Sequence, residues 1–250
     1  MSERQRATEF WDLSLARWTS GDADLSPELT RWQQSYSGRG PGAVDLSVFP
    51  EPYVGPLAGQ GTPALVMLGL NPGPPAPEFQ AMHGIFTEQI AATTYGEWAA
   101  SAPYTSSTWE QIKGRNKYHR DRLAFARRLH EDSSIEAADL LYMELYPFHS
   151  ERVTGPMVPP RDVLHDYVLS PLSEMDVEFI FAFGKPWFEA AESIGLGSGS
   201  TVWANWTTPS RQGKSYRLPG GSRLIVLAQG GYAGPPGQAD TEALRTELMR

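Results

Sequence analysis

Four short, mostly apolar runs recur along the chain, and each ends at a turn that contains glycine or proline. The runs are 64–68, 140–146, 177–183 and 223–228. Each is too short for a buried helix, and mostly apolar runs of this length are typical of strands that are covered on both faces. Apolar positions three or four residues apart between the runs favour helices. The pattern predicts an α/β fold, namely a three-layer α/β/α sandwich with a central, mainly parallel four-stranded sheet.

The first 60 residues predict a helical and Pro/Gly-rich extension that packs on this domain, so that residues 1–250 form one unit. Apolar residues between Phe10 and Trp18 have helical spacing, and Ser26 followed by Pro27 is typical of a helix start. Large aromatic residues at such spacing usually belong to a core, although tryptophans can also stack on bases. Within the loop that follows, Tyr53 is a candidate to line a site, and packing beside proline is the alternative.

Composition narrows the classes of function. The chain contains no cysteine, which excludes disulfides, thiolate catalysis and Cys-ligated metal clusters. Its net charge of −8 argues against nucleic acid wrapped around most of the surface but leaves room for one basic patch. The N-terminus has no apolar signal core, and no apolar run is long enough to span a membrane. We expect a cytoplasmic monomer without membrane association, metal or cofactor.

The turn after the first strand carries the most specific motif, GLNPG. Asn71 lies between Gly69 and Leu70 on one side and Pro72 and Gly73 on the other. Ligands of parallel sheets bind beyond the carboxyl ends of the strands, and glycines let the backbone approach a ligand closely. Asn71 is therefore a candidate functional residue. The alternative is an ordinary turn in which its side chain caps the backbone.

The GLNPG motif after a buried strand resembles the first active-site motif of the uracil-DNA glycosylase superfamily, above all its mismatch-specific and single-strand-selective branches. The resemblance covers about residues 64–234 and implies that Asn71 positions the water that attacks the sugar carbon. It also implies that Gly69, Leu70, Pro72 and Gly73 surround the substrate. An aromatic residue of the following loop, Phe79 or Phe86, would stack on the extruded base. His83 lies in the same loop without a second histidine at metal-ligand spacing.

The second strand ends in MELYPF, where the resembling families place an Asn that reads the pyrimidine edge. Glu144 occupies that place. An amide can accept from uracil N3–H and donate to O4, whereas an ionised carboxylate can only accept. A protonated Glu144, or a base with an amino group, would restore complementarity; a pair with Arg152 or a loop N–H is the structural alternative. His149, on the turn after the strand, is a further candidate at this edge.

The last strand opens into QGGYAGPPG, where the resembling families carry a His-Pro-Ser or Asn-Pro-Ser turn. Gln229 falls on the His or Asn position, and Tyr232 is the candidate that would wedge into the DNA stack. The resemblance thus implies that Gln229 hydrogen-bonds the departing base. A neutral amide stabilises a developing anion less than a charged or strongly polarised donor does, which predicts weak catalysis.

The stretch 113–130 holds seven Lys or Arg and one acid. Arg115, Lys117 and Arg120 are candidate contacts to DNA phosphates, since a local basic patch can hold a strand in register. A solvated helix whose arginines pair with acids elsewhere explains the same pattern. Tyr118 and His119 between the basic residues favour nucleic acid, since aromatic rings can stack on bases.

Together these features predict a glycosylase that hydrolyses the N-glycosidic bond of a damaged, mismatched or modified base in DNA. A base- or nucleotide-binding protein that does not cleave, and a small-molecule enzyme that reuses the pocket, are the alternatives. Glu144 and the Gln229 turn favour the first alternative, and the net charge of −8 favours the second.

Overall fold

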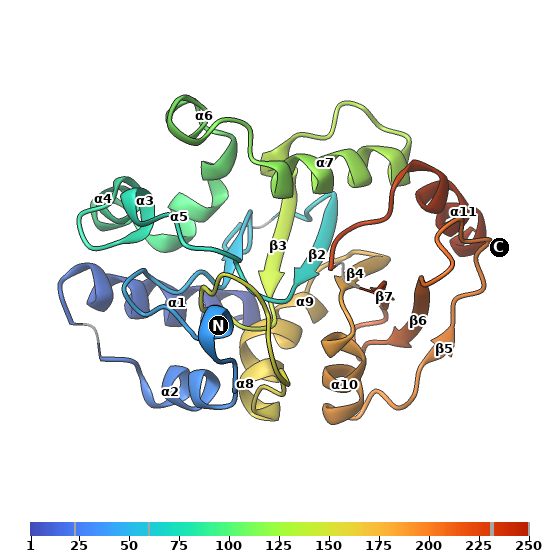
Figure 1. Cartoon of the computed structure of the whole chain (residues 1–250), viewed down its shortest axis with the longest axis horizontal. Helices are drawn as coiled ribbons and strands as arrows, with labels where there is room; N and C mark the ends of the chain where they lie inside the picture. The colour runs from blue at the N-terminus through green and yellow to red at the C-terminus, as the bar shows by residue number, and fades with distance from the viewer. Residues whose placement is uncertain (23, 60, 231–232, 250) are drawn as a thin grey trace.

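The fold is a mixed α/β arrangement in which helices surround one sheet (Figure 1). It was obtained as a computed structural model and describes residues 1–22, 24–59, 61–230 and 233–249. The strands are β1 Tyr53–Val54, β2 Leu65–Gly69, β3 Leu140–Glu144, β4 Phe179–Phe183, β5 Ser200–Thr201, β6 Gln212–Arg217 and β7 Arg223–Ala228.

The α-helices are α1 Glu3–Thr19, α2 Pro27–Gln34, α3 Pro77–Gln80, α4 Ile85–Ala92, α5 Tyr95–Ala100, α6 Ser107–Lys113, α7 Lys117–His130, α8 Arg161–Leu164, α9 Ser170–Ser173, α10 Pro186–Ser193 and α11 Gln238–Leu248. Short 3-10 turns are η1 Gly40–Gly42, η2 Pro103–Thr105 and η3 Ala137–Asp139, and a π-helical turn η4 His165–Leu169 joins α8 to α9. The apolar residues of this helical stretch, Leu164, Val168 and Leu172, are buried.

The sheet among the described residues has seven strands in the order β1-β3-β2-β4-β7-β6-β5. Its central four, β3, β2, β4 and β7, are parallel and are the four strands predicted from the apolar runs. The expectation of four strands in total was wrong. The remaining strands, β1, β5 and β6, pair antiparallel with their neighbours, and none of them is a continuous buried apolar run of the length of the central four.

Helices pack along both sides of the parallel strands. Phe125 of α7 contacts the rings of Phe181 and Phe183, with centroids 5.2 and 5.8 Å apart, and α11 lies against α7. In the view of Figure 1, α7 and α11 lie above the strands and α8, α9 and α10 below them. This arrangement leaves the carboxyl ends of the central strands for the loops that follow them.

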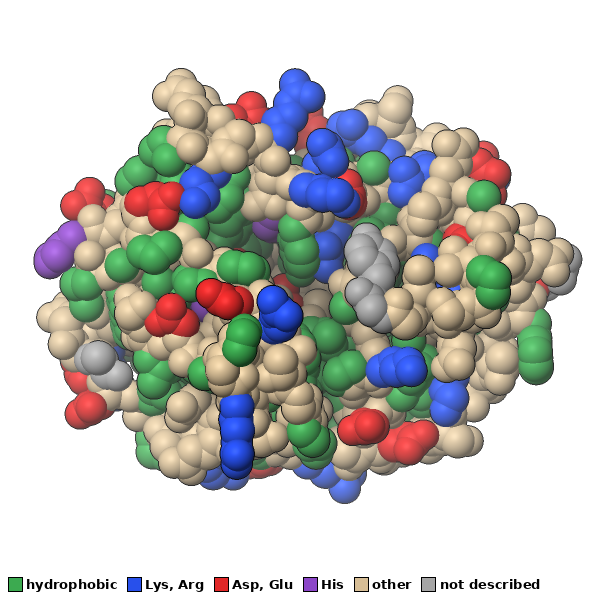
Figure 2. Space-filling view, viewed as in Figure 1, with side chains coloured by type: hydrophobic (Ala, Val, Ile, Leu, Met, Phe, Trp, Pro, Cys, Tyr) green, Lys and Arg blue, Asp and Glu red, His purple; other side chains and the backbone are tan. Residues whose placement is uncertain are grey.

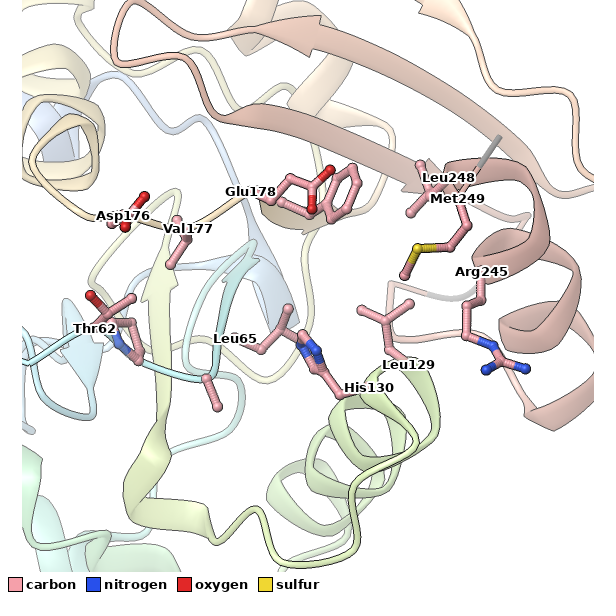
Figure 3. Close-up of a pocket in the computed structure, with 13 residues that line it drawn as sticks. Thr62, Leu65, Leu129, His130, Asp176, Val177, Glu178, Arg245, Leu248 and Met249 are labelled. Atoms are coloured by element: carbon pink, nitrogen blue, oxygen red, sulfur yellow. The ribbon is translucent and has the colours of Figure 1, made fainter.

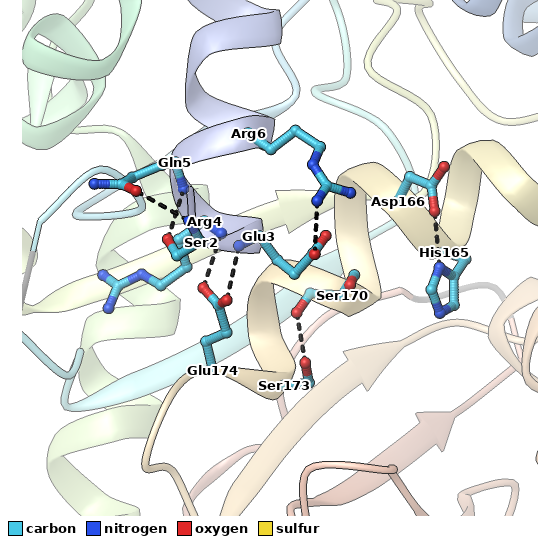
Figure 4. Close-up of polar contacts among 10 residues, drawn as sticks. All are labelled: Ser2, Glu3, Arg4, Gln5, Arg6, His165, Asp166, Ser170, Ser173 and Glu174. Atoms are coloured by element: carbon cyan, nitrogen blue, oxygen red, sulfur yellow. Dashed lines mark hydrogen bonds and ion pairs between the residues drawn. The ribbon is translucent and has the colours of Figure 1, made fainter.

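The N-terminal helices belong to the same core as the sheet. Trp11 of α1 and Trp32 of α2 are fully buried, and the indole N–H of Trp32 donates to the carbonyl of Leu145 beyond β3 at 2.9 Å. The first turn of α1 is held by Glu174, whose carboxylate accepts from the backbone N–H groups of Glu3 and Arg4 at 2.7 and 3.0 Å (Figure 4). The predicted start of α2 is confirmed, since Ser26 accepts from the N–H of Leu29.

Candidate functional site

The turn after β2 and the end of β3 meet at the carboxyl edge of the sheet. The parallel register pairs Gly69 directly with Glu144. A Cβ atom on Gly69 would lie 2.2 Å from Oε2 of Glu144, far inside any allowed contact. The first glycine of GLNPG is therefore needed because the carboxyl group of Glu144 lies against it.

The carboxyl group of Glu144 is buried, and only one of its two oxygens has a hydrogen-bond partner among the described residues. Its side chain is 6 % exposed, Oε1 accepts a hydrogen bond of 2.8 Å from the hydroxyl of Tyr118, and Oε2 is buried without a partner among the described residues. Burial raises the pKa of Glu144 to about 7, and the positive charge of Arg122 and the Tyr118 hydrogen bond offset only part of that rise. Arg152, the partner considered from the sequence, forms no hydrogen bond or ion pair with Glu144 in the described part of the chain. The group can thus exchange a proton near neutral pH.

A second buried carboxyl group, Glu51, lies beside the same pocket. Its Oε2 accepts from the hydroxyl of Tyr104 and, at 3.2 Å, from the amide of Gln80. The same amide group of Gln80 is 2.7 Å from the hydroxyl of Tyr104. Burial raises the pKa of Glu51 to about 8, and the nearby carboxyl group of Glu144 adds to the rise. Both acids are consequently neutral over much of the range in which an ordinary glutamate is ionised.

The two acids line one pocket of about 340 Å³. Its walls come from the turn after β2, from the start of α7 and from aromatic residues of the neighbouring segments. The aromatic members are Tyr104, Trp109, Tyr118, His119 and Tyr142. Figure 2 shows a hollow at the centre of this face, with Lys and Arg side chains gathered above it. An apolar, aromatic pocket with a few polar groups is typical of a site for a planar ligand.

His119 contributes a neutral ring to this wall. It is buried, and it stacks on Tyr104 with centroids 4.6 Å apart and an angle of 13°. Burial and the positive charge of Arg122 lower the pKa of His119 to about 3. Arg122 itself is buried with its guanidinium 3.2 Å from the ring centroid of Tyr118, and its Nη2 has no partner among the described residues.

Asn71 lies in the turn after β2, directly before the pocket-lining residues Pro72 and Gly73. Its Nδ2 donates to Ser150 Oγ at 2.9 Å and to the carbonyl of Phe148 at 3.4 Å. Both contacts use the NH₂ group, so they fix the amide with Oδ1 as its acceptor side. Asn71 itself is not among the residues that line the pocket, and neither are Gly69 and Leu70.

His149 supports the turn rather than the pocket wall. It is 1 % exposed, and its Nδ1 lies 3.2 Å from the carbonyl of Gly73. If Nδ1 carries the proton it donates to that carbonyl. Burial lowers the pKa of His149 to about 4, so the ring is neutral at physiological pH. His149 thus contacts the backbone of Gly73 without lining the pocket itself.

Phe79 and Phe86 are core residues, which contradicts the expectation that one of them stacks on a ligand. They are 0 % and 1 % exposed and contact each other with centroids 4.7 Å apart. Both also contact Trp109, which does line the pocket. The spacing of apolar residues in 74–97 reflects this packing, because α3 and α4 bury those rings against one another.

Gln229 lies in a different pocket from Glu144. Its Oε1 accepts from Arg211 at 2.6 Å, and both residues line a polar pocket with Arg128 and Thr208. The structure therefore does not bring Gln229 to the pocket of Glu144, because the end of β7 is separated from the end of β3 by β2 and β4. Tyr232 lies outside the described residues.

Several basic side chains of the stretch 113–130 already contact acids or backbone carbonyls of the protein. Lys117 and Arg120 are exposed on α7, and both contact Asp121. Lys113 pairs with Glu78 at 2.7 Å, whereas Arg127 and Arg128 donate to backbone carbonyls. Arg115 is exposed just before α7. The residues proposed to contact DNA lie together, next to the pocket, at the start of this helix.

Two further features bound the chemistry. Among the described residues, no group of three or more His, Cys, Asp or Glu side chains is placed to hold a metal ion. In that same part of the chain, no helix combines the length and apolar character needed to cross a membrane.

A separate, more apolar pocket of about 230 Å³ lies at the opposite edge of the sheet, lined by residues that include Thr62, Glu178 and Leu248 (Figure 3). It lacks the turn residues and the buried acids of the first pocket.

Sequence reasoning missed Glu51, Tyr104 and Trp109 as pocket residues. Glu51 lies two residues before Tyr53, which was considered instead and is buried with its ring against Tyr95. The available signal was an acid between two prolines, FPEPY, because proline fixes the backbone and so can hold a buried side chain in place. Nothing in the spacing of Tyr104 and Trp109 separates them from core aromatics.

Comparison with protein-family models, with curated proteins and with solved structures found no match to this chain. The geometry of the site therefore has to carry the functional argument.

Proposed function

We propose that this protein binds a nucleobase extruded from DNA in the Glu144 pocket and hydrolyses its N-glycosidic bond, on a three-layer α/β/α sandwich of the uracil-DNA glycosylase type. The observation that carries the proposal is the buried Oε2 of Glu144, which has no partner among the described residues although its group lines a pocket. Such a group costs free energy in the empty protein unless a ligand satisfies it.

The position of the pocket supports this function. The strands that carry the GLNPG turn and Glu144 are neighbours, so both sets of residues reach the same edge. Tyr104, Trp109, Tyr118 and Tyr142 offer flat apolar surfaces to a base, and base-modifying enzymes hold an extruded base between such side chains. The exposed Lys117 and Arg120 lie beside the pocket, where a phosphate backbone would run.

Asn71 is the group that would orient the attacking water. Its NH₂ is engaged by Ser150 and Phe148, which leaves Oδ1 to accept a hydrogen bond from a water at the rim. In the proposed reaction the C1′–N bond breaks through an oxocarbenium-like sugar, and the water adds to C1′ on the face opposite the departing base. The fixed amide supplies position rather than strong base catalysis.

The test is a panel of single- and double-stranded oligonucleotides that carry uracil, thymine mismatches, hypoxanthine, cytosine, adenine and modified cytosines. Abasic-site formation and binding are measured in parallel. We expect cleavage of at least one substrate, a loss of at least about 100-fold in Asn71→Ala with binding retained, and no change in the exposed control Asn205→Ala. Undiminished turnover in Asn71→Ala would contradict the role of this residue.

A binding function without cleavage is the second candidate. It is favoured because Asn71 does not line the pocket and Gln229 lies in another one, so that the two residues expected to act in catalysis do not face Glu144 together. Under this alternative the same panel gives base-dependent binding without abasic sites.

A further inference from the structure

The two buried carboxyl groups of the pocket are held in the same way. Tyr118 donates to Oε1 of Glu144, and Tyr104 donates to Oε2 of Glu51. In each group the contacts from described residues engage one oxygen, Oε1 of Glu144 and Oε2 of Glu51, and the other oxygen has no hydrogen-bond partner among those residues. One buried cation, Arg122, acts on Glu144, and His119 is neutral. The pocket thus has more acceptor capacity than the described chain fills.

We propose that Glu144 reads an amidine edge, meaning an exocyclic amino group next to an unprotonated ring nitrogen, so that the bound base is of the cytosine or adenine type rather than uracil or thymine. This inference rests on the proposed function and names its substrate class. It follows from the unpartnered Oε2 of Glu144, the hydrogen bond of Tyr118 to Oε1, and their place in the wall of the pocket.

The hydrogen-bond pattern distinguishes the two classes of base. A neutral carboxyl group donates from Oε2 to the ring nitrogen and accepts the amino N–H at Oε1, which has a second lone pair beside the one used by Tyr118. If the proton moves to the ring nitrogen, both hydrogen bonds persist between a carboxylate and a protonated base. The imide edge of uracil matches only the neutral acid, because N3–H and O4 need an acceptor and a donor at once. An amidine edge therefore stays complementary whether the one shared proton lies on the acid or on the ring nitrogen, whereas the imide edge is complementary only while the acid holds it.

The same proton assists departure of the base. As the C1′–N bond breaks, its electron pair passes to the ring, and the ring nitrogen takes the proton from Oε2, so the base leaves neutral. The water oxygen bonds to C1′ and loses its proton to solvent, from which Glu144 is then reprotonated. This general-acid step replaces the stabilisation of an anionic base, for which Gln229 is not in position.

Glu51 strengthens the preference of the pocket for a base with an amidine edge. It lines the same pocket, and the carboxyl group of Glu144 raises the cost of ionising Glu51. A ligand that brings amino N–H groups or a positive charge relieves this repulsion, whereas the carbonyl-rich edge of uracil or thymine adds to it.

The experiment uses the full chain and short single strands in which one cytosine, adenine, uracil or thymine lies between tetrahydrofuran abasic analogues. Affinity is measured by fluorescence anisotropy between pH 6 and 8.5, and abasic-site formation in the same samples. We expect the cytosine or adenine strand to bind at least tenfold more tightly than the uracil strand at pH 8. Uracil binding should weaken about tenfold between pH 6 and 8, since the pKa of Glu144 is about 7.

Variants of Glu144 separate its role in recognising the base from its role in the fold. Glu144→Gln, whose amide always offers one donor and one acceptor, should bind all strands without pH dependence. The exposed control Glu189→Gln should behave as the unmodified protein. Equal affinity for all four strands, no binding, or tighter uracil binding at pH 8 would overturn the inference. Preferred amino bases without cleavage would refute only the hydrolase, and uracil excision without preference for amino bases would refute only the inference.

Discussion

Two buried carboxyl groups, Asp240 in α11 and Glu144 at the end of β3, differ in their hydrogen-bond donors and in their pKa. Asp240 accepts from the N–H and hydroxyl of Thr207 at 2.5 and 2.7 Å and from Arg211 at 3.0 Å. Burial alone would raise its pKa, but hydrogen bonds from Thr208 and Thr207 and the charge of Arg211 lower it to about 2. Glu144 has one hydroxyl donor and a pKa of about 7.

The difference separates a structural acid from one kept for a ligand. Asp240 has enough donors to stay ionised, so it holds the loop before β6 to the start of α11. Glu144 and Glu51 lack such donors, and the protein tolerates them because the neutral acid costs less to bury than a carboxylate does. Substitutions of Asp240 and of Glu144 should therefore affect stability to different extents.

The largest effect is expected for Asp240→Ala. It would remove the carboxylate that pairs with Arg211 and leave a buried cation, and breaking such a pair costs about 3–5 kcal/mol. Urea unfolding at pH 7 measures the free energy of unfolding, with the exposed Glu189→Ala as control, for which a change within about 0.5 kcal/mol is expected. A change in Asp240→Ala as small as that of the control would mean that the pair carries no structural role.

The next effect concerns Gly69→Ala. The added Cβ would displace the carboxyl group of Glu144 from its place, at a cost of about 1–3 kcal/mol. In the double variant Gly69→Ala/Glu144→Ala the obstacle is gone, so the two changes should not be additive in urea unfolding. Strict additivity would show that Gly69 is required for another reason.

A smaller effect is the pH dependence that the two glutamates impose. Their pKa values rise from 4.5 in the unfolded chain to about 7 and 8 in the fold, so the native state holds more protons and stability falls as pH rises from 4.5 toward 8. Below pH 6.5 the buried His119 and His149 act in the opposite direction, because the unfolded chain then binds more protons. The decline is therefore clearest between pH 6.5 and 8.

Thermal unfolding across that interval tests this dependence. Each glutamate should contribute about 1 kcal/mol per pH unit while it is ionised in the unfolded chain and neutral in the fold. Glu144→Gln should remove its share of the slope, and Glu51→Gln should act in the same way. An unchanged slope in both variants would mean that these acids are ionised in the native protein.

The smallest effect on stability is expected at the start of α7. Replacement of Arg115, Lys117 and Arg120 by Gln should change the free energy of unfolding by less than about 1 kcal/mol, because these side chains are exposed. If they contact phosphates, DNA affinity falls and the slope of log affinity against log salt decreases by up to about 3. An unchanged slope would remove this helix from the DNA contact.

The sequence predicted the elements whose signal is local. The four parallel strands were found because each is a short apolar run that ends at a turn, and α2 because a serine precedes its proline. The edge strand β1 was missed, since it contains two residues and gains its structure from pairing with β3. Local periodicity cannot predict a strand that depends on its neighbour.

Within the site, the sequence by itself determined that the GLNPG turn and Glu144 end two buried strands, because turn residues and apolar runs act over a few positions. The tertiary structure decided what surrounds them. Parallel register brought the Cα of Gly69 against Glu144, and a distant loop supplied Glu51. Packing buried Phe79 and Phe86, and the order of the strands sent Gln229 to another pocket. These outcomes depend on contacts between residues far apart in the chain, and the pKa of a buried acid depends on which of those contacts form.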